Sequence, residues 1–172
     1  MKTVVVVLML VAALALQTIL AGFMIGGRIA VNLVLVAVVY VALAFGPVTG
    51  LLAGAAAGLA QDSLAGGIVG IGGLAKTVIG FAVGVLGAQF IVSQMLPRFV
   101  MFVAATVVHE LLFQGMHALI ESRPLAMHYS PVLIQAGVNA VIGVTAFWVV
   151  ENGPRMLAGR RANRASFSKR RF

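Results

Sequence analysis

The chain has 172 residues, of which 62% are hydrophobic and only 9% are charged. Because a water-soluble domain usually carries about a quarter charged residues, this composition excludes an ordinary soluble protein and indicates one embedded in a membrane. Cysteine is absent, which excludes disulfides and thiolate sites.

The first apolar run, residues 3–22, is long enough to cross a bilayer core, which takes about 20 residues. Its start resembles a signal peptide, because Lys2 precedes an apolar stretch and Ala13-Leu14-Ala15 looks like a cleavage site. The uncharged stretch continues to Gly27, however, so we expect a retained first helix.

Five further apolar runs follow, and in hydrocarbon they should be helices because backbone groups must bond within their own segment. The Gly-rich segment 63–72 has low helix propensity and predicts a loop or a short re-entrant piece. Asn152-Gly153-Pro154 is expected to end the last helix. The predicted helices cover 29–45, 48–61, 74–93, 99–121 and 132–150, with a polar loop at 122–131. The fold class is an all-α membrane protein, a single bundle of six transmembrane helices, with five as the alternative.

The formal net charge of +8 is concentrated at the C-terminal end. Beside a membrane span, such a tail predicts a cytoplasmic flank attracted to anionic lipid head groups rather than a nucleic-acid-binding segment. Six helices then place the N-terminus and Arg98 on the cytoplasmic side too, whereas Arg28 and Arg123 fall outside. We divide the chain into a transmembrane bundle, 1–151, and a basic cytoplasmic tail, 152–172. The basic residues of the tail are Arg155, Arg160, Arg161, Arg164, Lys169, Arg170 and Arg171.

Two rows of small residues predict close helix packing. In the third predicted helix, glycines recur every four residues, and Asp62 continues their row. The fourth helix carries a matching row that includes Lys76. We expect these rows to pack against each other within the chain, although a homodimer could use the same faces. The packing glycines are Gly50, Gly54 and Gly58 in the third helix and Gly80, Gly84 and Gly87 in the fourth.

Asp62 and Lys76 reach a similar depth when these two helices form a hairpin. We therefore predict that the two side chains pair. The pair would either fix the hairpin or form a site for substrate or protons, since charges inside membranes are costly and often functional.

The fifth predicted helix carries a stripe of polar residues at steps of four, four, three and four, which covers an arc of about 80°. The stripe is Thr106, Glu110, Gln114, His117 and Glu121, and the sixth helix adds Gln135 and Asn139. Folding the chain back at the 122–131 loop would bring Asn139 level with Gln114 and His117. The stripe is either a hydrogen-bonded seam between the two helices, or a cavity or partner-docking groove lined by Glu110 and His117. A catalytic role is a third alternative.

Catalytic and metal motifs are incomplete in this sequence. His109-Glu110 begins the zinc-protease pattern HExxH, but Phe113 stands where the second histidine should be. The glycines of 66–73 lack the Lys-Ser/Thr ending of a phosphate-binding loop, and no serine has a histidine and an acid at a recognisable spacing. We therefore expect no catalytic residues, no metal and no cofactor.

Residues 46–87, GPVTGLLAGAAAGLAQDSLAGGIVGIGGLAKTVIGFAVGVLG, resemble the rod shape-determining protein MreD family. Gly58, Leu59 and Asp62 match the family's Gly-Leu-x-x-Asp element, and Gln17 matches a glutamine late in its first helix. The close resemblance covers about a quarter of the chain, and the remainder agrees in helix layout. The basic tail is longer than the resemblance leads one to expect, so the resemblance implies nothing about it.

The resemblance implies a non-enzymatic scaffold of the cell-elongation complex in the bacterial inner membrane. Its expected partner is MreC, a single-span protein, within a wider assembly with MreB, RodA and a class B penicillin-binding transpeptidase. The family fold is similar to that of energy-coupling-factor transporter S subunits. The alternative is therefore a substrate-binding subunit of a vitamin-type transporter, with Glu110, Gln114, His117 and Asn139 lining its cavity. One Trp and two Tyr in the chain are few for such a cavity.

Overall fold

The computed structural model describes residues 2–21, 31–66, 68–90, 94–122 and 129–168, the last fifteen of these by their backbone only. Within these ranges all regular structure is helical, which confirms the expected helical membrane bundle. Four of the helices described, α1, α4, α5 and α6, are long and apolar enough to cross a membrane. The elements are α1 (Lys2–Ala21), α2 (Leu33–Phe45), α3 (Pro47–Ala65), α4 (Ile71–Gln89), α5 (Met95–Ile120) and α6 (Tyr129–Ser168).

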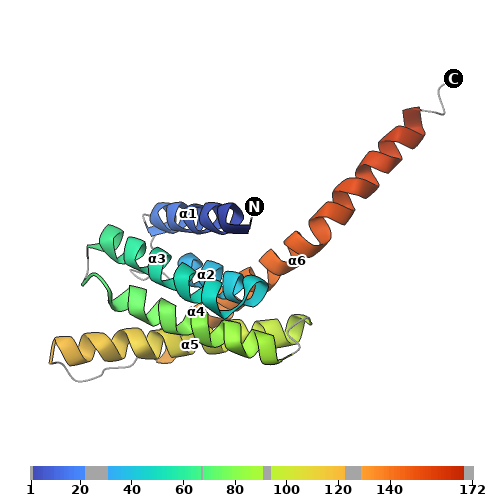
Figure 1. Cartoon of the computed structure of the whole chain (residues 1–172). Helices are drawn as coiled ribbons and strands as arrows, with labels where there is room; N and C mark the ends of the chain where they lie inside the picture. Colours follow the sequence, from blue (N-terminus) through green and yellow to red (C-terminus); the bar gives the residue numbers. More distant parts are fainter. Residues whose placement is uncertain (1, 22–30, 67, 91–93, 123–128, 169–172) are drawn as a thin grey trace.

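Helix α2 is the centre of the bundle and contacts all five other helices (Figure 1). Its sequence, LVLVAVVYVALAF, is apolar on every side, and a helix of this kind must be buried all round. It begins later than predicted because Asn32 caps it, with Oδ1 accepting a hydrogen bond from the amide of Leu35 at 3.0 Å. Thirteen residues span about 20 Å, less than the bilayer core of about 30 Å.

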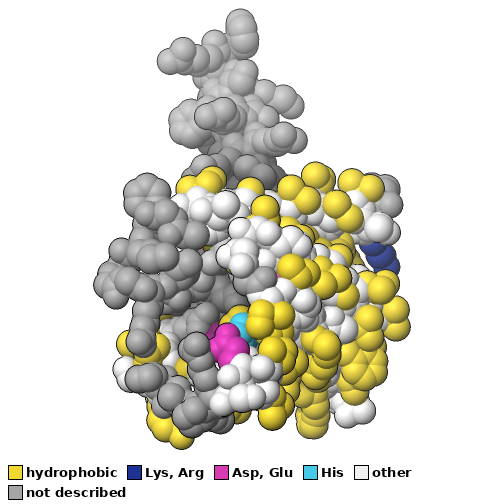
Figure 2. Space-filling view, turned by 90° about the vertical axis from the view of Figure 1, so that its left-hand side faces the viewer, with side chains coloured by type: hydrophobic (Ala, Val, Ile, Leu, Met, Phe, Trp, Pro, Cys, Tyr) yellow, Lys and Arg dark blue, Asp and Glu magenta, His cyan; other side chains and the backbone are white. Residues whose placement is uncertain are grey.

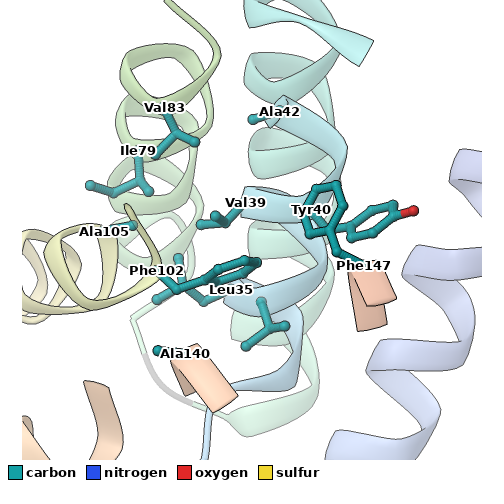
Figure 3. Packing of buried hydrophobic residues seen from close by; sticks show 11 residues of the cluster. Leu35, Val39, Tyr40, Ala42, Ile79, Val83, Phe102, Ala105, Ala140 and Phe147 are labelled. Atoms are coloured by element: carbon teal, nitrogen blue, oxygen red, sulfur yellow. The ribbon is translucent and has the colours of Figure 1, made fainter. Parts of the chain in front are cut away.

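The core around α2 is built from aliphatic and aromatic side chains of four helices (Figure 3). The rings of Tyr40 in α2 and Phe147 in α6 lie 4.2 Å apart, and Phe102 of α5 meets Phe147 edge-on at 6.4 Å. Phe102 fits there because Gly143 leaves room, and a Cβ at that glycine would collide with the Phe102 ring. Helix α1 lies on the outside against α2 and α3 (Figure 1).

The predicted loop at 63–72 is present but shorter than expected. Helix α3 continues to Ala65 and α4 already begins at Ile71, so only a short turn separates them. Gly66 and Gly70 in this turn have φ angles of 69° and 111°, which glycine adopts at little cost. Glycines lower the helix propensity of α4, but packing compensates for this loss, as tertiary contacts commonly do.

The predicted end of the last helix at Asn152-Gly153-Pro154 is also wrong, because α6 continues to Ser168 and leaves the bundle (Figure 1). Proline removes one backbone donor and can bend a helix without ending it. The sequence that follows is rich in Arg and Ala, which are good helix formers. Lys169, Arg170 and Arg171 lie outside the described residues, as do Arg28 and Arg123.

Different helix starts and ends lie at the two ends of the bundle. Helices α1 and α5 begin at the end where α6 leaves the bundle (Figure 1). At the opposite end, α3 and α5 finish and α4 begins. This arrangement places the starts of α1 and α5 and the basic extension on one side, as the six-helix topology requires.

Candidate functional site

Helices α3 and α4 pack through the two glycine rows. A Cβ on Gly50 would collide with the carbonyl oxygen of Gly80, and a Cβ on Gly80 would collide with that of Gly50. One turn further on, Gly54 lies against the carbonyl group of Lys76. The backbones touch directly at these places, which only glycine permits.

The rows continue at both ends of the hairpin. A Cβ on Gly58 would lie 2.5 Å from Cα of Gly73, and one on Gly84 would collide with Pro47. Gly87 meets a leucine of α2 instead, where a Cβ would lie 2.9 Å from the side chain. The described contacts of both rows therefore lie within this chain.

Asp62 closes the turn between α3 and α4. Its Oδ2 accepts hydrogen bonds from the backbone N–H groups of Gly70, at 2.9 Å, and Gly73, at 3.0 Å. Gly72 is also required, because a Cβ there would run into the carboxylate. These donors belong to the start of α4, where N–H groups lack intrahelical partners and the helix dipole favours a negative charge.

The prediction that Asp62 and Lys76 form an ion pair is therefore wrong. Both residues are described and buried, yet the Asp62 carboxylate binds backbone amides and is not within ion-pair distance of the ammonium. The amides at the helix start bind the carboxylate instead, and each would cost about 1–3 kcal/mol if it were buried without a partner. Lys76 remains within electrostatic range of Asp62 and Glu110.

His109 is buried near Lys76 and Asp62, a position that was not predicted from the sequence. Its side chain is 2% exposed, and Nδ1 lies 3.4 Å from Oε1 of Glu110. Nε2 of the ring has no hydrogen-bond partner, and neither does the buried Oε1 of Gln61. The ring stacks on Phe113, with centroids 5.9 Å apart. The charged groups of Lys76 and Asp62 also act on His109.

Asn139 is the centre of a second, fully satisfied polar network. Its Oδ1 accepts from the backbone N–H of Asn32 at 3.0 Å, and its Nδ2 donates to Oγ1 of Thr106 at 3.3 Å. Both Asn139 and Thr106 are buried, at 0% and 1% exposure. Asn32 is the cap of α2, so this network joins α2, α5 and α6.

The predicted alignment of Asn139 with Gln114 and His117 is wrong, because Asn139 is level with Thr106 instead. The chain reverses earlier than assumed. Ser122 adopts a left-handed φ of 51° directly after α5, and α6 already begins at Tyr129. Gln135 is half-buried on α6, where no hydrogen bond of its side chain is described.

The outer part of the α5 stripe is progressively more exposed. Gln114 Nε2 donates to Oε2 of Glu110 at 3.3 Å, and a ring nitrogen of His117 lies 3.0 Å from the carbonyl oxygen of Phe113. Glu110, Gln114 and His117 are half-buried, and Glu121 is exposed. Figure 2 shows acidic and histidine side chains reaching the surface side by side on the end face of the bundle.

Two further polar contacts were not predicted, although the sequence held signals for both. Arg98 and Glu151 form two hydrogen bonds, 2.9 and 2.6 Å long, and Arg98 also lies over the ring of Phe147 at 4.4 Å. An antiparallel hairpin of the last two helices brings these positions together. Gln17 donates to the carbonyl oxygen of Val31 and accepts from the backbone N–H of Leu33, at the start of α2. The signal in the sequence was Asn32, a residue type that caps helices, directly before an apolar run.

The fold and these contacts define a multi-pass helical membrane protein whose buried polar side chains join its helices. Among the described residues, no group of three or more His, Asp or Glu could hold a metal ion. The family model of the rod shape-determining protein MreD matches residues 1–152, so the chain belongs to the MreD family. Nothing matched in the comparisons with curated proteins and with solved structures. The family confirms the resemblance and assigns a role in rod shape determination.

Proposed function

We propose that this protein is a non-enzymatic scaffold of the machinery that elongates the cell by peptidoglycan synthesis, and that it binds MreC. The observation that carries the proposal is the use made of the buried polar groups. Asn139, Asp62 and Arg98 each fix one helix to another. Intramembrane polar residues are expensive and usually mark a function, and here most of them serve the rigidity of the bundle.

A groove between α1 and α3 offers a docking surface for the membrane-spanning helix of MreC. It has a volume of about 630 Å³, and α3 contributes Thr49, Ala53 and Ala56 at helical spacing, facing Val6 and Leu10 of α1. Small residues let a helix backbone approach closely inside a membrane. The glycine rows are occupied by α3–α4 packing, whereas this small-residue surface is available to a partner.

A bulky residue in the groove tests this assignment. Ala56 is exposed and lines the groove, so Ala56→Trp should fill it without disturbing the core. We expect MreC to be lost from the purified protein while the unfolding midpoint in detergent is unchanged. Val100→Trp, on the exposed face of α5, is the matched control and should retain MreC. Equal recovery of MreC with both variants would rule out the groove.

The wider assembly would comprise MreB, RodA and a class B penicillin-binding transpeptidase in the bacterial inner membrane. In this arrangement both termini are cytoplasmic, and the basic extension of α6 is attracted to anionic lipids. This orientation is supported by the helix starts: α1 and α5 begin at the same end of the bundle at which α6 leaves it (Figure 1).

The second candidate is a substrate-binding subunit of a small-solute transporter. The half-buried stripe of Glu110, Gln114 and His117 favours it, because these side chains could face a solute. Asn139 counts against it, since both ends of its amide are engaged by the protein. Solute binding that is abolished by Gln114→Ala but retained by Leu111→Ala would support this candidate.

A further inference from the structure

We propose that α3, α4 and α5 enclose a water-filled vestibule that admits small hydrophilic cations in preference to anions. The vestibule opens at the end of the bundle where α3 ends and α4 begins. Its interior is the layer of His109, Lys76 and Gln61, and it closes at Thr106 and Asn139. This hydrated site does not depend on the proposed scaffold role.

The unpartnered atoms of the layer are the first observation. A buried polar group without a hydrogen bond loses about 1–3 kcal/mol, so native proteins satisfy nearly all of them. Here Nε2 of His109 and Oε1 of Gln61 are buried without a protein partner, whereas Nδ1 of His109 lies 3.4 Å from the Glu110 carboxylate. A neutral imidazole needs one donor and one acceptor, and the amide oxygen needs a donor. Water supplies both kinds of bond, and sites of this polarity hold it.

The path to the surface is the second observation. Along α5, Thr106 is buried, Glu110, Gln114 and His117 are half-buried, and Glu121 is exposed. Polar side chains therefore line one continuous stripe from the layer to the end of the helix. The inner limit is the Asn139–Thr106 contact, in which both side chains are bonded and nearly inaccessible.

The charge of the vestibule sets its selectivity. Asp62 and Glu110 carry two formal negative charges and Lys76 one positive charge, and these groups act on one another electrostatically. These three groups together carry one net negative formal charge. A solute of positive charge is thus favoured inside over a negative one of the same size.

Cysteine accessibility tests the proposal directly, because the natural chain contains no cysteine. Gln114→Cys and His117→Cys are treated in permeabilised membranes with thiosulfonate reagents of similar size and opposite charge. We expect both positions to react, and Gln114→Cys to react about fivefold or more faster with the cationic reagent, because a nearby negative unit charge attracts the cation by about 1 kcal/mol in water and repels the anion by a similar amount. Glu121 adds to this bias only at the mouth.

Two controls use the same helix. Leu111→Cys and Val108→Cys lie on exposed apolar positions, 44% and 45% accessible, which would face lipid. They should stay unreactive, because a thiol ionises poorly in hydrocarbon. Reaction at Gln114→Cys as slow as at Leu111→Cys would mean a dry seam and would overturn the vestibule. Equal rates with both reagents would overturn the cation preference.

A measurement on the unaltered chain covers the case in which a cysteine variant fails to fold. A water-soluble carbodiimide should modify Glu110 in membranes, because its half-buried carboxylate faces the vestibule. Absence of modification at Glu110, with Glu121 modified in the same sample, would also overturn the proposal.

Discussion

Asp62 is the residue on which the turn between α3 and α4 most depends, because one carboxylate oxygen serves two backbone amides. Asp62→Ala should lower the free energy of unfolding by about 1–3 kcal/mol, since it leaves buried donors unpaired. The unfolding midpoint in detergent measures this. Ser63→Ala is the control, because its exposed hydroxyl bonds only to Leu59 of the same helix and its loss should be nearly neutral. Similar stability of the two variants would contradict the capping role.

The side-chain amide of Asn139 joins three helices, so its replacement should lower the stability of the whole bundle. Asn139→Ala leaves the Asn32 N–H without its acceptor and should cost about 1–2 kcal/mol, near the upper end for such bonds in membranes. The same unfolding assay checks it. Thr145→Ala should have little effect, because its exposed hydroxyl bonds only to Val141 in its own helix. A loss no greater than that of Thr145→Ala would show that the network is dispensable.

Single residues were predictable where local rules apply and not where the tertiary register decides. Asn32 precedes an apolar run and could have been recognised as a helix cap from the sequence. The hydrogen bonds of Asp62 could be predicted only if α4 was known to begin at Ile71, and the glycine-rich sequence there obscured that start. His109 lies off the polar stripe of α5, and only the approach of α3 and α4 shows that it is buried in a polar layer.

At the scale of elements, the α3–α4 hairpin depends on backbone contact. Gly54→Ala should cost about 1–3 kcal/mol or more, because the new methyl group collides with the carbonyl of Lys76. Gly54→Leu should be worse. In the control Gly115→Ala the added Cβ meets nothing within 4 Å, and that change should stabilise α5 by up to about 1 kcal/mol. Unchanged detergent stability in Gly54→Ala would refute the close packing.

Helices α5 and α6 are tied at one end by Arg98 and Glu151. A double-mutant cycle with Arg98→Gln and Glu151→Gln should give a coupling free energy of about 1 kcal/mol. The bidentate geometry favours a real coupling, whereas the 51% exposure of the Glu151 side chain keeps it modest. Additive losses in the unfolding midpoint would mean that the pair does not hold the helices together.

Helix boundaries were predicted well where hydropathy sets them and poorly where packing does. The first helix was expected at 3–22 and is observed at Lys2–Ala21, because its composition leaves no alternative. The segment 63–72 was expected as a loop, because glycine propensity was weighed without the partner helix that makes glycine necessary. The continuation of α6 past Pro154 was missed because the proline was expected to end the helix.

At the scale of the whole molecule, the bundle was predictable from composition and hydropathy, and the family match over residues 1–152 agrees with it. The central position of α2 was not predicted, although its uniformly apolar sequence indicates burial on all sides. The rows of glycine were assigned to packing, and the groove between α1 and α3 became visible only with the fold. Sequence periodicity identifies apolar faces, but it does not say which of them a neighbour covers.

If this member of the MreD family is a scaffold that binds MreC, MreC should accompany it when it is extracted from the membrane. The tagged chain is purified in a mild detergent, and the proteins that accompany it are identified by mass spectrometry. We expect a single-span MreC together with RodA and a class B penicillin-binding transpeptidase. Recovery of ATPase subunits and a coupling membrane protein, with MreC absent, would contradict it and favour the transporter.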